Sequence, residues 1–123
     1  MKQVLLDTNF IMSCARQKID IFHEIPFMGL EILIPKQVID ELKKLSKSKE
    51  SAYVREDADL ALKLINRNKF VLMKLRRNDV DRGIIEFAEA NPGAIIATLD
   101  KEMKERIKNQ KMIIRGTKTL EIR

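Results

Sequence analysis

The sequence is poor in the residues that build disulfide frameworks and zinc sites. It contains one cysteine, Cys14, one histidine, His23, and no tryptophan. A single cysteine excludes an internal disulfide, and one cysteine with one histidine supplies too few ligands for a zinc site. Such sparing use of cysteine is typical of a cytoplasmic protein. We expect Cys14 to be a small core residue and His23 to lie in a surface loop.

Long apolar runs are also missing. Too few apolar residues separate Met1 from Asp7 to form a signal peptide, and no run approaches the length of a membrane span. The sequence therefore predicts a cytoplasmic protein. Its aromatic residues are one tyrosine and five phenylalanines, mostly within apolar patterns, so we expect no dedicated platform for stacking bases.

Charge and apolar residues are plentiful. Hydrophobic residues make up 45% and charged residues 34% of the 123 positions, which indicates a packed core under an ionic surface and excludes general disorder. This length is typical of one domain, and we expect a single domain over residues 1–123. The formal net charge of +6 suits a polyanionic partner, but it also serves solubility, so charge alone does not identify the partner.

Short apolar runs alternate with helical patterns along the chain. The runs predict strands at 3–6, 31–34, 70–73, 94–98 and 112–114, with a further short strand at 119–122. Helical spacing predicts helices that begin after Asp7, at Pro35, after Ser51, near Asn78 and at Asp100. We expect the first helix to continue through Ile19 to Phe22. Buried strands separated by helices predict an α/β fold, with a central parallel sheet of about five strands between two helical layers.

Four acids fall where such a sheet binds ligands, at and beyond the carboxyl ends of its strands. Asp7 follows the first strand and Asp100 the fourth, although helix capping alone could explain either one. Glu41 is expected on the flank of its helix's apolar stripe, leaning back toward the strand edge. Asp81 is expected within the apolar stripe of its own helix, where the helix dipole does not explain an acid.

Four neighbouring carboxylates would repel one another unless protons or cations lay among them. Oxygen ligands without cysteine or histidine favour Mg²⁺ or Mn²⁺ over zinc, and these ions commonly also bind phosphate oxygens. Phosphodiester chemistry is the expected result. Thr98, Thr8 and Asn9 are candidate supporting residues, although a structural strand threonine and ordinary helix-start residues are equally consistent with them.

These residues resemble the motifs of the PIN domain family of metal-dependent nucleases. The resemblance covers nearly the whole chain in four ordered blocks: Leu5-Leu6-Asp7-Thr8-Asn9, Ile34-Pro35 with Val38 and Glu41-Leu42, Asp81 with Ile84 and Ala88, and Ala97-Thr98-Leu99-Asp100. It implies one PIN-like nuclease domain with Mg²⁺- or Mn²⁺-dependent endoribonuclease activity. It also implies that the catalytic metal ligands are Asp7, Glu41, Asp81 and Asp100, with Asp7 and Asp100 as the primary pair.

The resemblance also implies partners. The family includes toxins of toxin-antitoxin pairs and factors that mature ribosomal RNA, and residues 114–120 look more like the ribosomal RNA branch; both roles stay open. RNA, an antitoxin or ribosomal precursor, and a second copy in a homodimer are the expected partners. The candidate RNA-binding cations, most of which could equally be plain solvated surface, are Lys43, Lys44, Arg76, Arg77 and Arg82.

Two other functional hypotheses are alternatives to the nuclease. A non-catalytic RNA-binding or ribosome-assembly scaffold could keep this fold while its acids only cap helices, and dependence of activity on metal separates the two. Phosphoryl transfer through an aspartyl nucleophile fits less well, because Asp7 is followed by Thr8 and Asn9 without the second nearby acid that such enzymes use.

Overall fold

The structure is a computed structural model that describes residues 1–116 and 118–123, so Thr117 of the 114–120 segment lies outside the described residues. The strands are β1 Gln3–Leu6, β2 Glu31–Pro35, β3 Val71–Met73, β4 Ile95–Ala97, β5 Lys111–Arg115 and β6 Thr119–Ile122. The helices are α1 Thr8–Gln17, α2 Ile21–Phe27, α3 Lys36–Ser46, α4 Ala52–Asn66, α5 Val80–Ala90 and α6 Lys101–Arg106.

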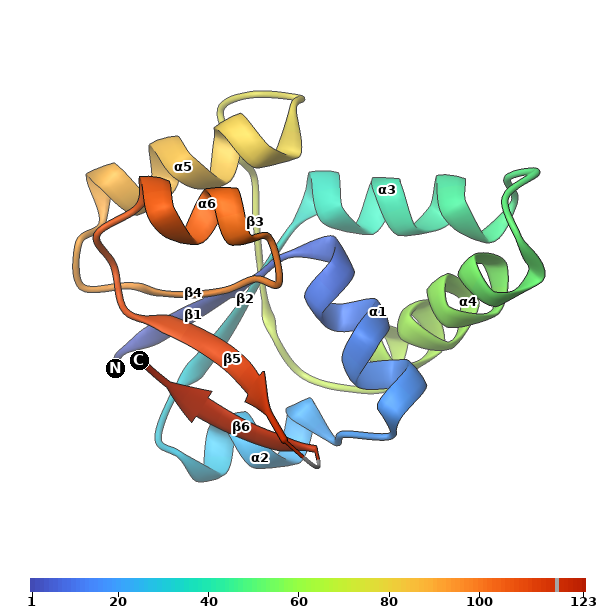
Figure 1. Cartoon of the computed structure of the whole chain (residues 1–123), viewed down its shortest axis with the longest axis horizontal. Helices are drawn as coiled ribbons and strands as arrows, with labels where there is room; N and C mark the ends of the chain where they lie inside the picture. The colour runs from blue at the N-terminus through green and yellow to red at the C-terminus, as the bar shows by residue number, and fades with distance from the viewer. Residues whose placement is uncertain (117) are drawn as a thin grey trace.

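The strands form one sheet in the order β3-β2-β1-β4-β5-β6 (Figure 1). Strands β1 to β5 are parallel to one another, and β6 pairs antiparallel with β5 at the end of the sheet. The predicted parallel sheet is confirmed, and the short strand predicted at 119–122 is its sixth member. Chain order reverses at β1, because β2 lies on one side of it and β4 on the other. Such a switch point leaves a crevice outside the carboxyl ends of the two strands.

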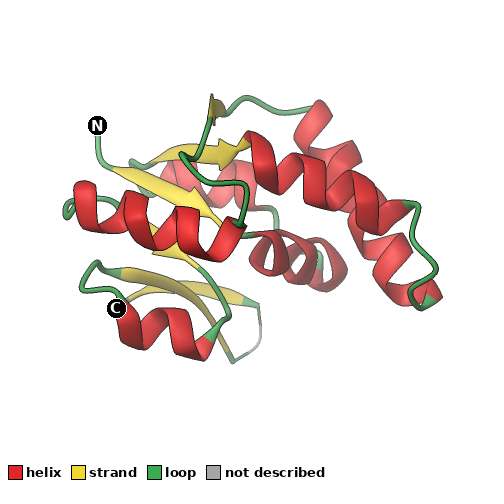
Figure 2. Cartoon of the chain, turned by 90° about the horizontal axis from the view of Figure 1, so that it is seen from above, coloured by secondary structure: helices red, strands yellow, loops and turns green. Residues whose placement is uncertain are grey.

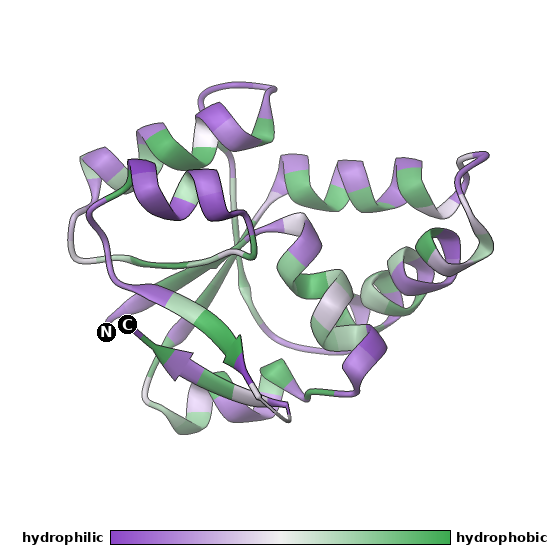
Figure 3. Ribbon diagram, in the orientation of Figure 1, coloured by the Kyte–Doolittle hydropathy of each residue, from purple (hydrophilic) through white to green (hydrophobic). Residues whose placement is uncertain are grey.

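Helices cover both faces of the sheet, as the predicted three-layer α/β/α fold requires (Figure 2). In Figure 1, α5 and α6 lie together on one side of the strands, while α1, α3 and α4 pack against one another. Green and purple residues alternate around α3 and α4 in Figure 3, because only one face of each helix meets the core. The fully buried side chains include Leu5, Ile34 and Ile96 from three different strands.

The first helix is shorter than its apolar spacing predicts, and the expected continuation to Phe22 is wrong. Lys18 takes a left-handed conformation with φ 60°, and its N–H donates to the carbonyl of Ala15, which ends α1 at Gln17. Ile19 is nevertheless buried, because chain reversal at a left-handed cap returns the next apolar residue to the core. The helical spacing of buried apolar residues therefore continues past the end of α1, although the helix itself does not.

The two residues singled out for their rarity have different surroundings. Cys14 is fully buried in α1, as expected, and burial raises the pKa of its thiol to about 12. His23 is exposed, but the loop predicted for it is wrong: it lies in α2 and stacks on Phe27 one helical turn later. Among the described residues, no helix is long and apolar enough to cross a membrane.

Candidate active site

Asp7 lies at the switch point between β1 and β4. Its backbone N–H donates to the carbonyl of Ala97 at 3.0 Å, which continues the pairing of the two strands by one residue. The side chain is buried, with 4% of the residue exposed. The pKa of this carboxyl is raised to about 6, chiefly by burial and to a smaller extent by the charges of Asp81 and Glu41, while the hydrogen bonds from Thr98 and Thr8 partly oppose the shift.

Thr98 joins two of the predicted acids. Its hydroxyl donates to Asp7 Oδ2 at 2.9 Å and accepts the backbone N–H of Asp100 at 3.0 Å. The other carboxylate oxygen of Asp7, Oδ1, accepts the backbone N–H of Thr8 at 2.7 Å. Thr98 is completely buried, so these bonds fix the Asp7 carboxylate and the start of the Asp100 segment relative to each other.

Asp100 is partly exposed and caps α6. Its Oδ1 accepts the backbone N–H of Met103 at 3.2 Å, so the helix-capping alternative is a real role for this residue. No hydrogen bond between described residues ends on Asp100 Oδ2. Asp100 can therefore cap α6 through one oxygen and still present the other to a cation.

Asp81 faces the start of α6 from the first turn of α5. The residue is exposed, so its expected place within the buried stripe is wrong; the buried residues of α5 are Val80, Gly83, Ile84 and Ala88. The N-cap is Asp79, whose carboxylate accepts the N–H of Arg82, and Asp81 is not needed for capping. Partial desolvation raises the pKa of Asp81, and the neighbouring charge of Asp100 raises it further.

Glu41 lies on the flank of the α3 stripe, as expected, but it is exposed and not partly turned toward the core as that position suggested. The helix buries Val38 and Leu42, and Glu41 lies beside that stripe rather than in it. Its charge nevertheless reaches the edge of the sheet, since it raises the pKa of both Asp7 and Asp81. Asp7, Glu41 and Asp81 are thus coupled electrostatically, and Asp100 is coupled to Asp81.

One acid near this group was not foreseen. Glu102 shares a small hollow with Asp81 and Asp100, and its charge contributes to the raised pKa of Asp81. Its position in the first turn of α6, two residues after Asp100, is the sequence signal that could have identified it, but first-turn acids are common for the helix dipole alone.

The acids do not form a closed cage. Within residues 1–116 and 118–123, no three histidine, cysteine, aspartate or glutamate side chains lie close enough to hold one ion together. The donor set still fits a hard divalent cation, because Mg²⁺ usually binds one or two carboxylates and keeps several waters. The buried Thr8 hydroxyl, beside Asp7, has no hydrogen-bond partner among the described residues, and a bound water or substrate oxygen could satisfy it.

The supporting and cationic residues lie around this edge. Asn9 is exposed and lines a cavity that also contains Asp100. The five predicted RNA-binding cations are all exposed: Lys43, Lys44, Arg76, Arg77 and Arg82. Two of them are already paired, Arg77 with Glu86 at 2.6 Å and Arg82 with Asp79 at 3.9 Å. Lys44 shares a hollow with Glu41.

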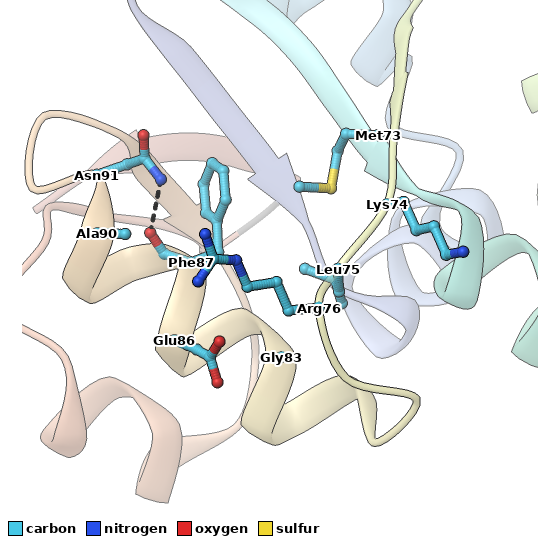
Figure 4. A pocket seen from close by; sticks show the side chains of 9 residues that line it. All are labelled: Met73, Lys74, Leu75, Arg76, Gly83, Glu86, Phe87, Ala90 and Asn91. Atoms are coloured by element: carbon cyan, nitrogen blue, oxygen red, sulfur yellow. Dashed lines mark hydrogen bonds between the residues drawn. The ribbon is translucent and has the colours of Figure 1, made fainter.

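A separate pocket lies between α5 and the chain that follows β3 (Figure 4). Its volume is about 180 Å³, and its walls include Leu75, Arg76 and Phe87. None of the four acids lines it. We therefore place the candidate active site at the carboxyl edge of the sheet and not in this pocket.

Comparison with known proteins agrees with this fold. A family model described as "PIN like domain" matches residues 4–116. Ribonuclease VapC4 of Methanocaldococcus jannaschii is 30% identical over 128 residues, which cover 99% of this chain and 97% of that protein. The structure of the PIN domain endonuclease Utp24 matches with a TM-score of 0.77 at 25% identity, covering 98% of this chain and 90% of that one. The chain belongs to the PIN-like domain family, as its motifs predicted.

Proposed function

We propose that the chain is an endoribonuclease that hydrolyses RNA phosphodiester bonds with Mg²⁺ or Mn²⁺. One observation carries the proposal: a buried carboxylate, Asp7, is held by two hydrogen bonds at the switch point of a parallel sheet, within the field of further acids. The ribonuclease and endonuclease named above support this activity, and the name of the first favours RNA as substrate.

The proposed ligands are Asp7 and Asp100, with Glu41 and Asp81 completing the binding of the ion or positioning water. A bound divalent cation would lower the pKa of water and offset negative charge on the phosphate. Thr98 aligns the two primary ligands, because its hydroxyl bonds both segments. Since burial raises the pKa of Asp7 to about 6, a nearby cation favours the ionised form that binding requires.

Water is the proposed nucleophile, and no side chain of the site replaces it. The one thiol, Cys14, is buried, and its pKa of about 12 keeps it protonated at neutral pH. A ribosomal precursor as substrate, and an antitoxin or a second copy as binding partner, stay predictions of the sequence resemblance.

Cleavage of single-stranded RNA tests the proposal. We expect the purified chain to cut RNA in Mg²⁺ or Mn²⁺ and not in excess EDTA, and we expect Asp7→Asn to lower the rate by about 100-fold or more. Asparagine keeps an oxygen that can accept the Thr8 N–H, so the loss would report the missing charge. The matched control is Asp20→Asn, the same change at the exposed start of α2.

A binding measurement accompanies the rates. Mn²⁺ should raise the melting temperature of the wild type and of Asp20→Asn, but raise it less in Asp7→Asn. Equal cleavage in EDTA, or an Asp7→Asn variant as active as the wild type, would contradict the proposal, and RNA binding without cleavage in Mg²⁺ or Mn²⁺ would favour the non-catalytic RNA-binding alternative.

A further inference from the structure

A cavity of about 450 Å³ lies beside the acidic edge and reaches Asp100. Its walls come from α1, α4 and the connection between β4 and α6. Its lining residues include Asn9, Met12, Arg16, Val54, Asp57 and Leu99. The hydrolytic roles proposed above use none of these side chains, so the cavity calls for its own explanation.

One part of the wall is apolar. Met12 and Val54 are partly exposed, and Leu99 is 39% exposed although it lies between the buried Thr98 and the partly exposed Asp100. Packing in the core does not account for a leucine that faces solvent next to a candidate catalytic acid. An apolar wall beside a phosphodiester site suits the flat face of a nucleobase, which loses water-exposed surface on binding.

The other part of the wall is polar, and it consists of the Arg16 guanidinium paired with the Asp57 carboxylate. Arg16 Nη1 donates to Asp57 Oδ2 at 3.4 Å, and Arg16 Nη2 donates to Ser13 Oγ at the same distance. No other hydrogen bond between described residues reaches the Asp57 carboxylate, whose side chain is 15% exposed. A carboxylate in the wall disfavours an RNA phosphate and favours the N–H groups of a base.

We propose that this cavity binds one unpaired nucleobase, with guanine preferred, from the RNA strand that lies across the acidic edge. Guanine presents N1–H and N2–H donors beside its O6 acceptor, which complements the carboxylate of Asp57 next to the guanidinium of Arg16. The exposed amide of Asn9 can bond a further edge atom. This inference rests on the proposed ribonuclease function and deepens it.

The cavity restricts the class of RNA that the site accepts. A base in a duplex is stacked on its neighbours and its Watson–Crick edge is already paired, so it cannot enter the cavity. Because Asp100 belongs to both the cavity and the acidic edge, a strand that places a base here brings adjoining backbone to the acids. Single-stranded or looped RNA with an accessible guanine is thus the substrate class.

Binding of short RNAs in EDTA tests the subsite without cleavage. Fluorescence anisotropy would compare labelled uridine hexamers in which one internal position is guanosine, adenosine, inosine or abasic. We expect guanosine to bind about tenfold tighter than the abasic strand, the scale of one good base-edge contact, and inosine, which lacks the N2 amino group, to bind between the two. Equal affinities for guanosine and abasic strands would overturn the subsite, and a preference for adenosine would overturn the guanine assignment.

Two variants and a control connect the preference to the cavity. Val54→Arg places a guanidinium three residues before Asp57, where it competes for the carboxylate, and Asp57→Asn removes that carboxylate, so each should reduce the guanosine preference to about twofold or less. Leu60→Arg is the matched control, since Leu60 is 40% exposed on the same helix and does not line the cavity. Retained preference in both cavity variants would overturn the proposal. If one variant fails to fold, the other variant and the comparison of the four hexamers on the wild type still test the subsite.

Cleavage assays separate this proposal from the one on which it rests. If the wild type cuts RNA with Mg²⁺ or Mn²⁺ but binds all four hexamers equally, the result supports the proposed nuclease and overturns the proposed base subsite. A wild type that prefers guanosine but never cuts contradicts the ribonuclease, and it reduces the cavity to an RNA-binding site.

Discussion

At the scale of single residues, Asp7 combines two demands that oppose each other. As a buried group it is more stable when protonated, and as a metal ligand it must be ionised. Thr98 and Thr8 offset part of the cost of the charge by donating hydrogen bonds to it. The remaining cost should be visible as a dependence of stability on pH when no metal is bound.

We predict that Asp7 destabilises the metal-free protein as pH rises through about 6. The folded pKa of about 6 lies above the usual value of 3.8, so the favourable contribution is present below about pH 4 and is lost as the group ionises in the fold. The shift corresponds to roughly 3 kcal/mol between the two limits. Urea unfolding in EDTA would measure the free energy of unfolding of the wild type and of Asp7→Asn across this range.

The difference between the two proteins isolates Asp7 from the other titrating groups. The free energy of unfolding of the wild type minus that of Asp7→Asn should fall as pH rises from about 4 to about 7. Saturating Mn²⁺ should reduce that fall. A difference that stays constant across the range would show that the Asp7 carboxyl is not perturbed by its burial.

At the scale of elements, the position of Asp81 depends on how α5 packs. Leu75, in the chain before α5, is buried, and its backbone is held by Gln37 of α3 through an N–H donated to Gln37 Oε1 at 3.0 Å and a carbonyl that accepts Gln37 Nε2 at 2.8 Å. The same leucine packs on Gly83 of α5. These contacts link the helix that carries Glu41 to the helix that carries Asp81.

We predict that Gly83→Ala lowers the free energy of unfolding by about 1 kcal/mol. A Cβ at Gly83 would lie 3.0 Å from Leu75 Cβ and Cδ1, and such overpacking costs more than the gain in helix propensity. The control is Gly93→Ala, where nothing lies within 4 Å of the added atom. Urea denaturation measures both, and a more stable Gly83→Ala would show that α5 can shift freely on Leu75.

At the scale of the whole molecule, the net charge of +6 and the exposed cations near the acidic edge favour association with RNA. The cations are not equivalent. Arg77 is already held by Glu86, whereas no ion pair among the described residues engages Lys43 or Lys44. A phosphate would gain more from a lysine that is not already held in a close ion pair.

We predict that Lys44→Gln weakens RNA binding and reduces the slope of log affinity against log salt by about 0.7, the value for one contact to a single strand. Arg77→Gln should change that slope less, because its guanidinium is already paired. Anisotropy in EDTA between about 50 and about 200 mM KCl would provide both slopes. An unchanged slope for Lys44→Gln would remove this lysine from the RNA path.

Local sequence pattern was enough to predict the alternation of strands and helices, the family, and the places of Asp7 and Asp100 after strands of the sheet. Apolar runs identify buried strands, and parallel strands bring their carboxyl ends to one side, so the positions of Asp7 and Asp100 followed from local pattern. The sequence predicted only that Thr98 and Asp100, two residues apart on an extended strand, face the same way; the bond from Thr98 to Asp7 joins residues 91 positions apart and depends on the pairing of β1 with β4.

Helix ends and the exposure of individual side chains could not be predicted from local pattern, because both depend on how the elements pack. The spacing of apolar residues did not show that Lys18 ends α1, because the chain can reverse and still return Ile19 to the core. Nor did it show that Glu41 and Asp81 are exposed, since the face that a helix buries depends on its partners. The pairing of Arg16 with Asp57 joins residues 41 positions apart, and only the packing of α1 on α4 brings them together.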